Sequence, residues 1–162
     1  MRKVLEVLAR TNHPVAIVTK SALVLRDLDL LAPMAGKGLV KVALSVTTLD
    51  PCLARKMEPR ATSPERRLDT IRRLSEANVP TAVMVAPIIP AINDAEIEAI
   101  LARAQAGGAR DAGFVLLRLP LEVRELFAEW LRVHYPDKLK HVLSLMRRRA
   151  RASSTIRGLA RG

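Results

Sequence analysis

The 162-residue sequence has one cysteine, Cys52, and only four aromatic residues. A single cysteine cannot form a disulfide within the chain, and it cannot by itself build a cysteine-rich metal or cluster site. The scarcity of aromatic side chains leaves few platforms on which nucleic-acid bases could stack. No apolar run approaches the roughly 18 residues of a membrane span, and the amino terminus lacks the apolar core of a signal peptide. We therefore expect a cytoplasmic protein that does not contact a membrane.

Positive charge is concentrated near the carboxyl terminus. The net charge is +11, and from Arg132 onward nine cations accompany a single acid, Asp137. Residues 147–162 contain six arginines and no acid. The preceding sequence is nearly balanced in charge and rich enough in apolar residues for a core. We expect a domain over residues 1–149 and a basic, disordered tail over 150–162, and such a tail attracts nucleic acid by releasing counterions.

Short apolar segments alternate with helical patterns along the chain. Ser63 followed by Pro64 predicts the start of one helix, and Asn78 can adopt the left-handed conformation that ends it. Segments that are apolar on both faces are typical of a parallel sheet covered by helices. The sequence thus predicts an α/β fold, either an open doubly wound sheet or half of a (β/α)₈-type barrel. The expected strands cover residues 14–19, 40–46, 81–85 and 114–117.

Polar residues follow the expected strands at the ends where ligands bind in both of these folds. Residues 45–50 (SVTTLD) supply hydroxyls and a carboxylate, which suit a ribose or an amino-acid ligand but equally form a strand-to-loop turn. Lys20 could neutralise an anion or be solvated. Arg60 could hold a carboxylate with two hydrogen bonds or be a surface ion. Residues 87–90, which contain two prolines, should be neither regular strand nor helix.

Other chemistry has little support in the sequence. No HExxH, CxxC or phosphate-loop pattern is present. Cys52 has no histidine near it in the sequence that would activate it as a nucleophile. We therefore assign no catalytic residue and no metal ligand.

Four segments, taken in order and spacing, resemble one known family. It comprises the bacterial radical S-adenosylmethionine (SAM) proteins called DNA repair photolyases, which are similar to spore photoproduct lyase. The resemblance extends from residue 1 to about residue 149. The matching segments are residues 45–50 (SVTTLD), 57–61 (MEPRA), 83–90 (VMVAPIIP, followed by Asn93 and Asp94) and 115–120 (VLLRLP).

The resemblance implies a fold, two cofactors and several roles. The family fold is a partial (β/α)₆ barrel of the TIM type, of which about four βα units would be present here. A CxxxCxxC loop holds a [4Fe–4S] cluster in the family, and SAM lies across the strand ends. Ser45 and Thr47 would lie near the ribose or methionyl group of SAM. Lys20 would face the barrel mouth, and Arg60 would meet a carboxylate.

The resemblance also places Pro87, Ile88 and Asn93 in the loop that lies against adenine. The sequence departs from the family pattern in three respects. The CxxxCxxC loop is absent, the first two βα units of the barrel are absent, and residues 147–162 do not match the segment that follows the last helix in the family. We therefore expect the carboxyl-terminal part of a lyase-like radical SAM enzyme, and we expect this part to be inactive alone.

Half a barrel would expose an apolar sheet edge near Val15. We expect a homodimer, or the missing amino-terminal half barrel, to cover this edge. The alternative hypothesis is a free-standing α/β protein without a cluster. Such a protein would bind nucleic acid or a protein partner through its basic carboxyl terminus.

Overall fold

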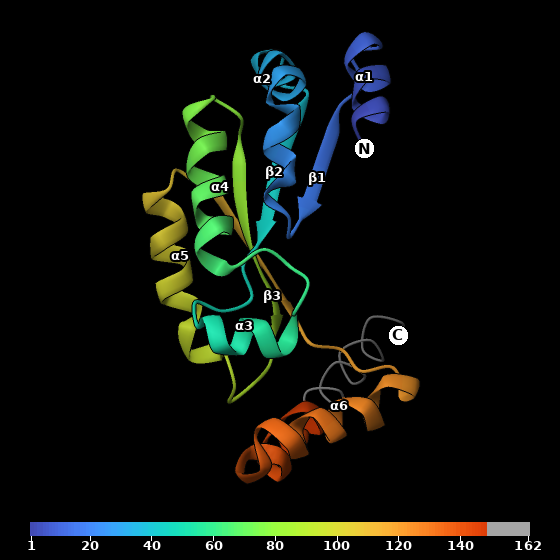
Figure 1. Ribbon diagram of the computed structural model, residues 1–162, viewed down its shortest axis with the longest axis vertical. Helices are drawn as coiled ribbons and strands as arrows, with labels where there is room; N and C mark the ends of the chain where they lie inside the picture. Colours follow the sequence, from blue (N-terminus) through green and yellow to red (C-terminus); the bar gives the residue numbers. More distant parts are fainter. Residues whose placement is uncertain (149–162) are drawn as a thin grey trace, which may run out of the picture. The chain divides into compact units, whose positions relative to one another are not determined.

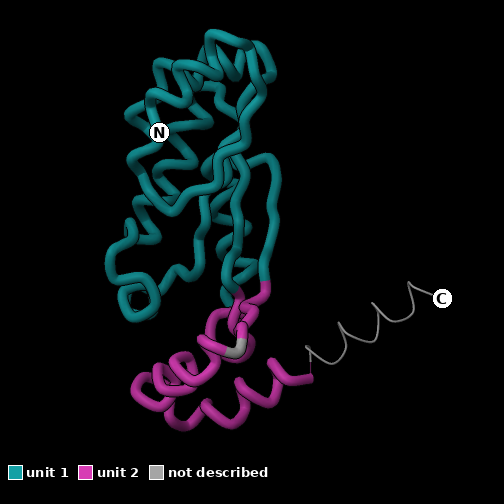
Figure 2. Tube along the Cα trace, turned by 90° about the vertical axis from the view of Figure 1, so that its right-hand side faces the viewer, with its two compact units in different colours: residues 1–87, 96–115 teal, residues 88–95, 116–162 magenta. Residues whose placement is uncertain are grey.

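A computed structural model of the protein describes residues 1–148. The tail expected over residues 150–162 lies outside the described residues. The chain divides into two compact units, one of residues 1–87 and 96–115 and the other of residues 88–95 and 116–162 (Figure 2). None of the helices in the described part is long and apolar enough to cross a membrane.

Helices and strands alternate along the chain as the sequence predicts. In chain order the elements are α1 (Arg2–Arg10), β1 (Val15–Thr19), η1 (Ala22–Asp27), α2 (Leu28–Gly36), β2 (Val40–Ser45), α3 (Pro51–Met57), α4 (Pro64–Glu76), β3 (Thr81–Ile88), η2 (Asp94–Glu96), α5 (Ile97–Ala106), β4 (Asp111–Leu116), α6 (Leu121–His134) and η3 (Pro136–Lys138). A further helix covers residues 139–148.

The four strands form one sheet in the order β1-β2-β3-β4. β1 and β2 pair in parallel from Val15 opposite Val40 onward, and β2 and β3 pair in parallel up to Ser45 opposite Met84. Because crossovers between parallel strands are right-handed, a consecutive strand order places all connecting helices on the same face. Figure 1 shows α2 and α4 in front of the strands. The prediction of a parallel α/β fold is confirmed, and the winding is that of a barrel rather than of a doubly wound sheet.

The core of the first unit lies between the sheet and these helices. Alternate strand residues point toward the helices, so Val42, Leu44 and Val83 are buried. Helical residues at spacings of three and four cover them from the other side. The buried helical residues include Leu31, Met34, Leu68, Ile71, Leu74, Ile100 and Ala104.

The opposite face of the sheet carries small or exposed side chains. Val18 is 63% exposed and lies opposite Ala43 of β2, which in turn lies opposite Ala82 of β3. β1 is an edge strand, so the backbone groups on its outer side have no strand to pair with in the described residues. The first unit therefore has the unpaired strand edge near Val15 that the sequence predicts.

The second unit is built around α6 and the helix over residues 139–148. Leu131 and Val142 are fully buried in it, and Trp130 stacks on Phe127 with ring centroids 5.8 Å apart. The apolar pattern of α6 predicts an inner face made of Val123, Leu126, Phe127, Trp130 and Leu131. Leu131 is buried as predicted and Phe127 and Trp130 are partly buried, whereas Val123 and Leu126 are exposed, Leu126 by 70%.

Two local predictions also need correction. β3 does not end near Val85 but continues through Pro87 to Ile88. β3 therefore includes Pro87, which the sequence placed outside regular strand, and the peptide bond between Ala86 and Pro87 is cis. The side-chain oxygen of Asn93 accepts a hydrogen bond from Ile89 N at 2.7 Å, and Glu96 is the N-cap residue of α5.

Candidate functional site

The carboxyl ends of β1 and β2 hold the polar residues of the candidate site. Lys20 follows β1 directly, and Ser45 is the last residue of β2. Short side-chain bonds fix the turn after β1: Thr19 Oγ1 accepts from Ser21 N at 3.1 Å, and Ser21 Oγ accepts from Leu23 N at 3.2 Å. The Ser21 bond caps the amino-terminal end of η1. Lys20 is therefore held at a defined place by its own neighbours in the chain.

The segment after β2 is buried and hydrogen-bonded. Thr47 Oγ1 lies 2.9 Å from the carbonyl oxygen of Ala86 in β3 and 3.2 Å from Glu58 Oε1. Thr48 Oγ1 donates to Glu96 Oε1, and Leu49 N donates to Glu96 Oε2, both at 2.6 Å. These bonds attach the end of β2 to β3 and to the segment that leads into α5.

Glu58, at the end of α3, links the two strand ends to α4. Its Oε1 accepts a hydrogen bond from Lys20 Nζ, and its Oε2 accepts one from Arg67 Nη2 at 2.6 Å. Arg67 also donates from Nε to Thr62 O at 2.7 Å and from Nη1 to Ser45 O at 2.9 Å. The Arg67 side chain is 2% exposed, that of Glu58 12% and that of Lys20 40%. Lys20 is thus the member of this network that solvent reaches most easily.

The protonation of Glu58 is set by these cations. Burial alone raises the pKa of the Glu58 carboxyl, but the hydrogen bonds from Lys20 and Arg67 and their charges outweigh burial, so its pKa lies below the ordinary 4.5. At neutral pH the network therefore contains one negative and two positive charges. The three side chains Lys20, Glu58 and Arg67 together thus carry one net positive charge, while the Glu96 carboxylate lies on the segment after β2.

The structure brings together three of the residues singled out in the sequence. Lys20 and Thr47 both contact Glu58, and Ser45 joins them through its carbonyl oxygen on Arg67. The side chains of Ser45 and Thr47 are 5% and 2% exposed.

The remaining predicted residues are Arg60, Pro87, Ile88 and Asn93. Arg60 is exposed in the turn before α4 and has no ion pair within the described residues. Pro87 is partly exposed at the end of β3 in the first unit. Ile88 and Asn93 belong to the second unit, where Asn93 is fully buried and bonds to its own loop. The ligand roles that the resemblance implies for these four residues stay predictions.

Arg67 was not singled out in the sequence, although the sequence contains a signal for it. It lies on the same face of α4 as Ile71 and Leu74, at spacings of four and three. A charged side chain at a core position requires a charged partner. Glu58, the acid of the MEPRA segment, supplies that partner.

The donor set of this chain does not fit a [4Fe–4S] cluster. Such a cluster needs several thiolates, whereas the sequence contains only Cys52, which is exposed. Within residues 1–148 no group of three or more His, Cys, Asp or Glu side chains could hold a metal ion. The net positive charge at Lys20, in contrast, fits an anionic group such as a carboxylate.

Residues 1–104 match the Radical SAM superfamily. This chain belongs to that superfamily. Its members typically use SAM and a [4Fe–4S] cluster. The parallel sheet with helices on one face agrees with a radical SAM partial barrel.

The curated relatives that this chain matches extend beyond the matched part. Uncharacterised proteins of Mycobacterium bovis and Mycobacterium tuberculosis strain H37Rv are each 33% identical to it over 150 residues, which cover 91% of this chain and 44% of each relative. An uncharacterised protein of Acidianus two-tailed virus is 38% identical over 89 residues, which cover 55% of this chain and 29% of the viral protein. The chain thus spans less than half the length of these relatives.

Proposed function

We propose that this radical SAM chain is the carboxyl-terminal part of an enzyme of the DNA repair photolyase type, and that its strand ends bind SAM. The observation that carries the proposal is the Lys20–Glu58–Arg67 network, which presents a reachable positive charge at the carboxyl end of β1. SAM carries a carboxylate that this charge can bind. The resemblance of the strand-end segments to that family supports the same ligand.

The chain alone is proposed to be inactive, because its one cysteine cannot hold the cluster that would reduce SAM. Anaerobic reconstitution with iron and sulfide tests this part of the proposal. We expect no [4Fe–4S] absorbance and iron well below four atoms per chain. A stable cluster with full iron content would contradict it.

The unpaired edge of β1 supports the proposal that a further strand, from outside this chain, completes the sheet. Val4 and Val7 of α1 are also exposed, by 61% and 47%, although both are apolar. In a complete barrel a further strand would pair with β1. We propose that the amino-terminal half barrel supplies this strand, and that a second copy of the chain covers the edge when that half is absent.

Binding of SAM to the purified chain tests the main proposal. We expect Lys20→Met to weaken SAM binding by about tenfold in isothermal titration, because it removes a charge-assisted hydrogen bond. Lys37→Met is the matched control. It removes the same charge next to Asn12, before β2 begins. Equal affinities of the Lys20 and Lys37 variants would contradict the proposal.

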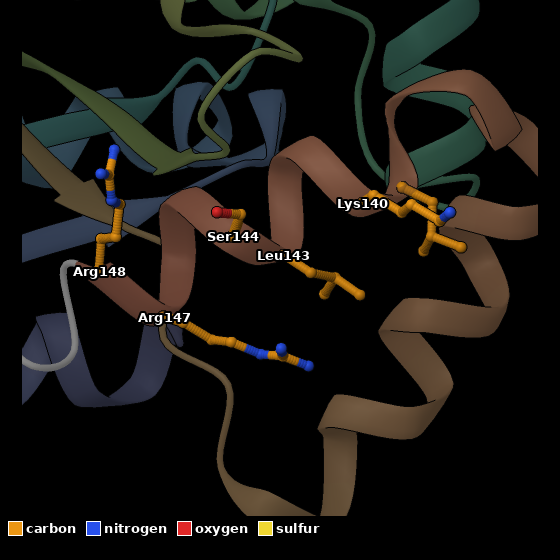
Figure 3. A pocket seen from close by; sticks show the side chains of 6 residues that line it. Lys140, Leu143, Ser144, Arg147 and Arg148 are labelled. Atoms are coloured by element: carbon orange, nitrogen blue, oxygen red, sulfur yellow. The ribbon is translucent and has the colours of Figure 1, made fainter.

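Nucleic-acid binding is a second candidate function, favoured by one feature of the second unit. A hollow of about 450 Å³ runs along the helix over residues 139–148 (Figure 3). Its lining combines basic, hydroxyl and apolar side chains, namely Leu139, Lys140, Leu143, Ser144, Arg147 and Arg148. Phosphate groups would bind such cations, so binding of nucleic acid should weaken steeply with salt.

The double variant Arg147→Gln, Arg148→Gln should reduce both the affinity for single-stranded DNA and the salt dependence of that affinity. An unchanged salt dependence would exclude this surface as the nucleic-acid binding site.

A further inference from the structure

Glu58 receives hydrogen bonds from two cations that belong to different elements. Lys20 follows β1, whereas Arg67 lies in α4, and Thr47 after β2 lies within 3.2 Å of the same carboxylate. One side chain therefore connects two strand ends with the helix that covers them. The MEPRA segment contributes to the site through its acid as well as through any role of Arg60.

Arg67 fixes where the Glu58 carboxylate lies. Its planar guanidinium donates to two backbone carbonyls, those of Thr62 and Ser45, and so cannot turn without breaking a buried bond. The third bond, to Glu58 Oε2 at 2.6 Å, then holds the carboxylate against this rigid group. The remaining oxygen, Oε1, is left to receive the Lys20 ammonium. The flexible lysine side chain is thereby tied to one position.

The charges of the network favour a ligand group with a single negative charge, such as a carboxylate. Two cations and one anion leave a net charge of +1, and Arg67 and Glu58 are shielded from solvent. Lys20 is 40% exposed, and an ammonium group has three N–H donors. It can thus keep its bond to Glu58 while it donates to a ligand carboxylate.

We propose that Glu58 is a positioning residue, which holds the Lys20 ammonium where a ligand carboxylate binds. This inference rests on the proposed function, since it takes SAM as the ligand. In the opposite role, the Glu58 carboxylate competes with the ligand carboxylate for Lys20, and the ligand must displace it. The two roles predict opposite signs for Glu58→Gln. Loss of a positioning residue weakens carboxylate binding, whereas loss of a competing negative charge strengthens it.

Isothermal titration of the full chain with SAM and with decarboxylated SAM distinguishes these roles. We expect Glu58→Gln to weaken SAM binding by about tenfold and to change the binding of decarboxylated SAM by less than about twofold. A general structural defect would weaken both ligands equally. In combination with Lys20→Met, the Glu58 substitution should cause no further loss, because both act through one bond.

Glu65→Gln is the matched control, since Glu65 is an exposed glutamate at the start of α4 that pairs with Arg103. It should leave the affinity for both ligands unchanged. Tighter or unchanged SAM binding by Glu58→Gln would overturn the positioning role while SAM binding by the wild-type chain stands. Failure of the wild-type chain to bind either ligand would overturn the proposed function and the positioning role together.

A second measurement does not depend on SAM. The rate at which acetic anhydride modifies Lys20, followed by mass spectrometry, reports how firmly the ammonium is held. We expect faster modification in Glu58→Gln and an unchanged rate in Glu65→Gln. If Glu58→Gln does not fold, Glu58→Asp keeps the charge but shortens the side chain, and it should also accelerate modification of Lys20. Equal rates in the wild type and in both Glu58 variants would overturn the proposal.

Discussion

Arg67 is the side chain on which the strand-end network depends most. We predict that Arg67→Met lowers the free energy of unfolding by about 3–5 kcal/mol, because it leaves the Glu58 carboxylate without its buried partner and two carbonyls without donors. Urea unfolding at neutral pH measures this loss. Arg103→Met is the control, since it breaks an exposed pair with Glu65 and should cost less than about 1 kcal/mol. Equal losses of unfolding free energy in the two variants would show that burial does not make the Arg67–Glu58 pair stronger than the Arg103–Glu65 pair.

Glu58 also gives the free energy of unfolding a defined pH dependence. Its folded pKa is below the ordinary 4.5, so the unfolded chain takes up this proton first as the pH falls. The stabilisation is complete above the unfolded pKa and is lost as the pH falls through the folded pKa. Urea unfolding from about pH 3 to pH 7 should therefore show a smaller acid-induced loss in Glu58→Gln than in the wild type.

Other carboxyls contribute to the acid sensitivity of the wild type. The hydrogen bonds from Arg103 and Arg2 lower the pKa values of Glu65 and Asp29. Both the wild type and Glu58→Gln retain these pairs. Subtracting the acid-induced loss of unfolding free energy in Glu58→Gln from that in the wild type therefore removes the contribution of Glu65 and Asp29. Parallel pH profiles of the two proteins would contradict the role assigned to Glu58.

Gly108 after α5 is a position where only glycine fits. Its φ is +92°, and a Cβ atom there would lie 2.2 Å from Ser75 Oγ and 2.7 Å from Ser75 Cβ. We predict that Gly108→Ala lowers the free energy of unfolding by about 1–3 kcal/mol, because strain and overlap add. Gly36→Ala is the control, since no atom lies within 4 Å of its added Cβ. Thermal unfolding of both variants measures the contrast, and a Gly108→Ala protein as stable as Gly36→Ala would refute it.

At the scale of elements, local signals predicted the helices and strands well. Ser63 precedes α4 as its N-cap residue, although its side chain makes no cap bond, and Asn78 has the expected left-handed φ of +57°. Proline was a misleading signal at Pro87, because β3 continues through it to Ile88. The rule against proline in strands applies only where the N–H is needed for pairing, and a sequence pattern does not show which N–H groups a neighbouring strand will use.

The strand order and the side-chain network also depend on information beyond local patterns. Alternation of helices and strands allowed both a doubly wound sheet and a barrel, and the spatial order β1-β2-β3-β4 decides between them. The sequence identified Lys20 and Thr47 as strand-end residues. It did not identify Arg67 as their support, because the pair with Glu58 forms only when α3 and α4 fold back over the strand ends.

At the scale of the whole molecule, the two units carry different properties. The first unit contains the sheet, the Lys20–Glu58–Arg67 network and most of the match to the superfamily. The second unit contains the basic helix over residues 139–148. SAM binding and nucleic-acid binding are thus proposed for different units, and substitutions in one unit should leave the other activity unchanged. This separation allows each proposal to be tested with the other as an internal control.

The uncovered sheet makes self-association the expected behaviour of the isolated chain. β1 is an edge strand, and Val18 of β1 and Val115 of β4 are 63% and 47% exposed. Large exposed apolar surfaces of this kind mark contacts with other chains. We predict a dimer or a larger species at tens of micromolar, measured by light scattering.

Val18→Lys should shift the protein toward the monomer, because a lysine opposes edge-to-edge strand pairing. Leu126→Lys is the matched control, since Leu126 is an equally exposed apolar residue of the second unit and its replacement should leave association through the sheet intact. A wild-type chain that is monomeric at this concentration would show that the open edge needs no partner, and the half-barrel proposal would then fail.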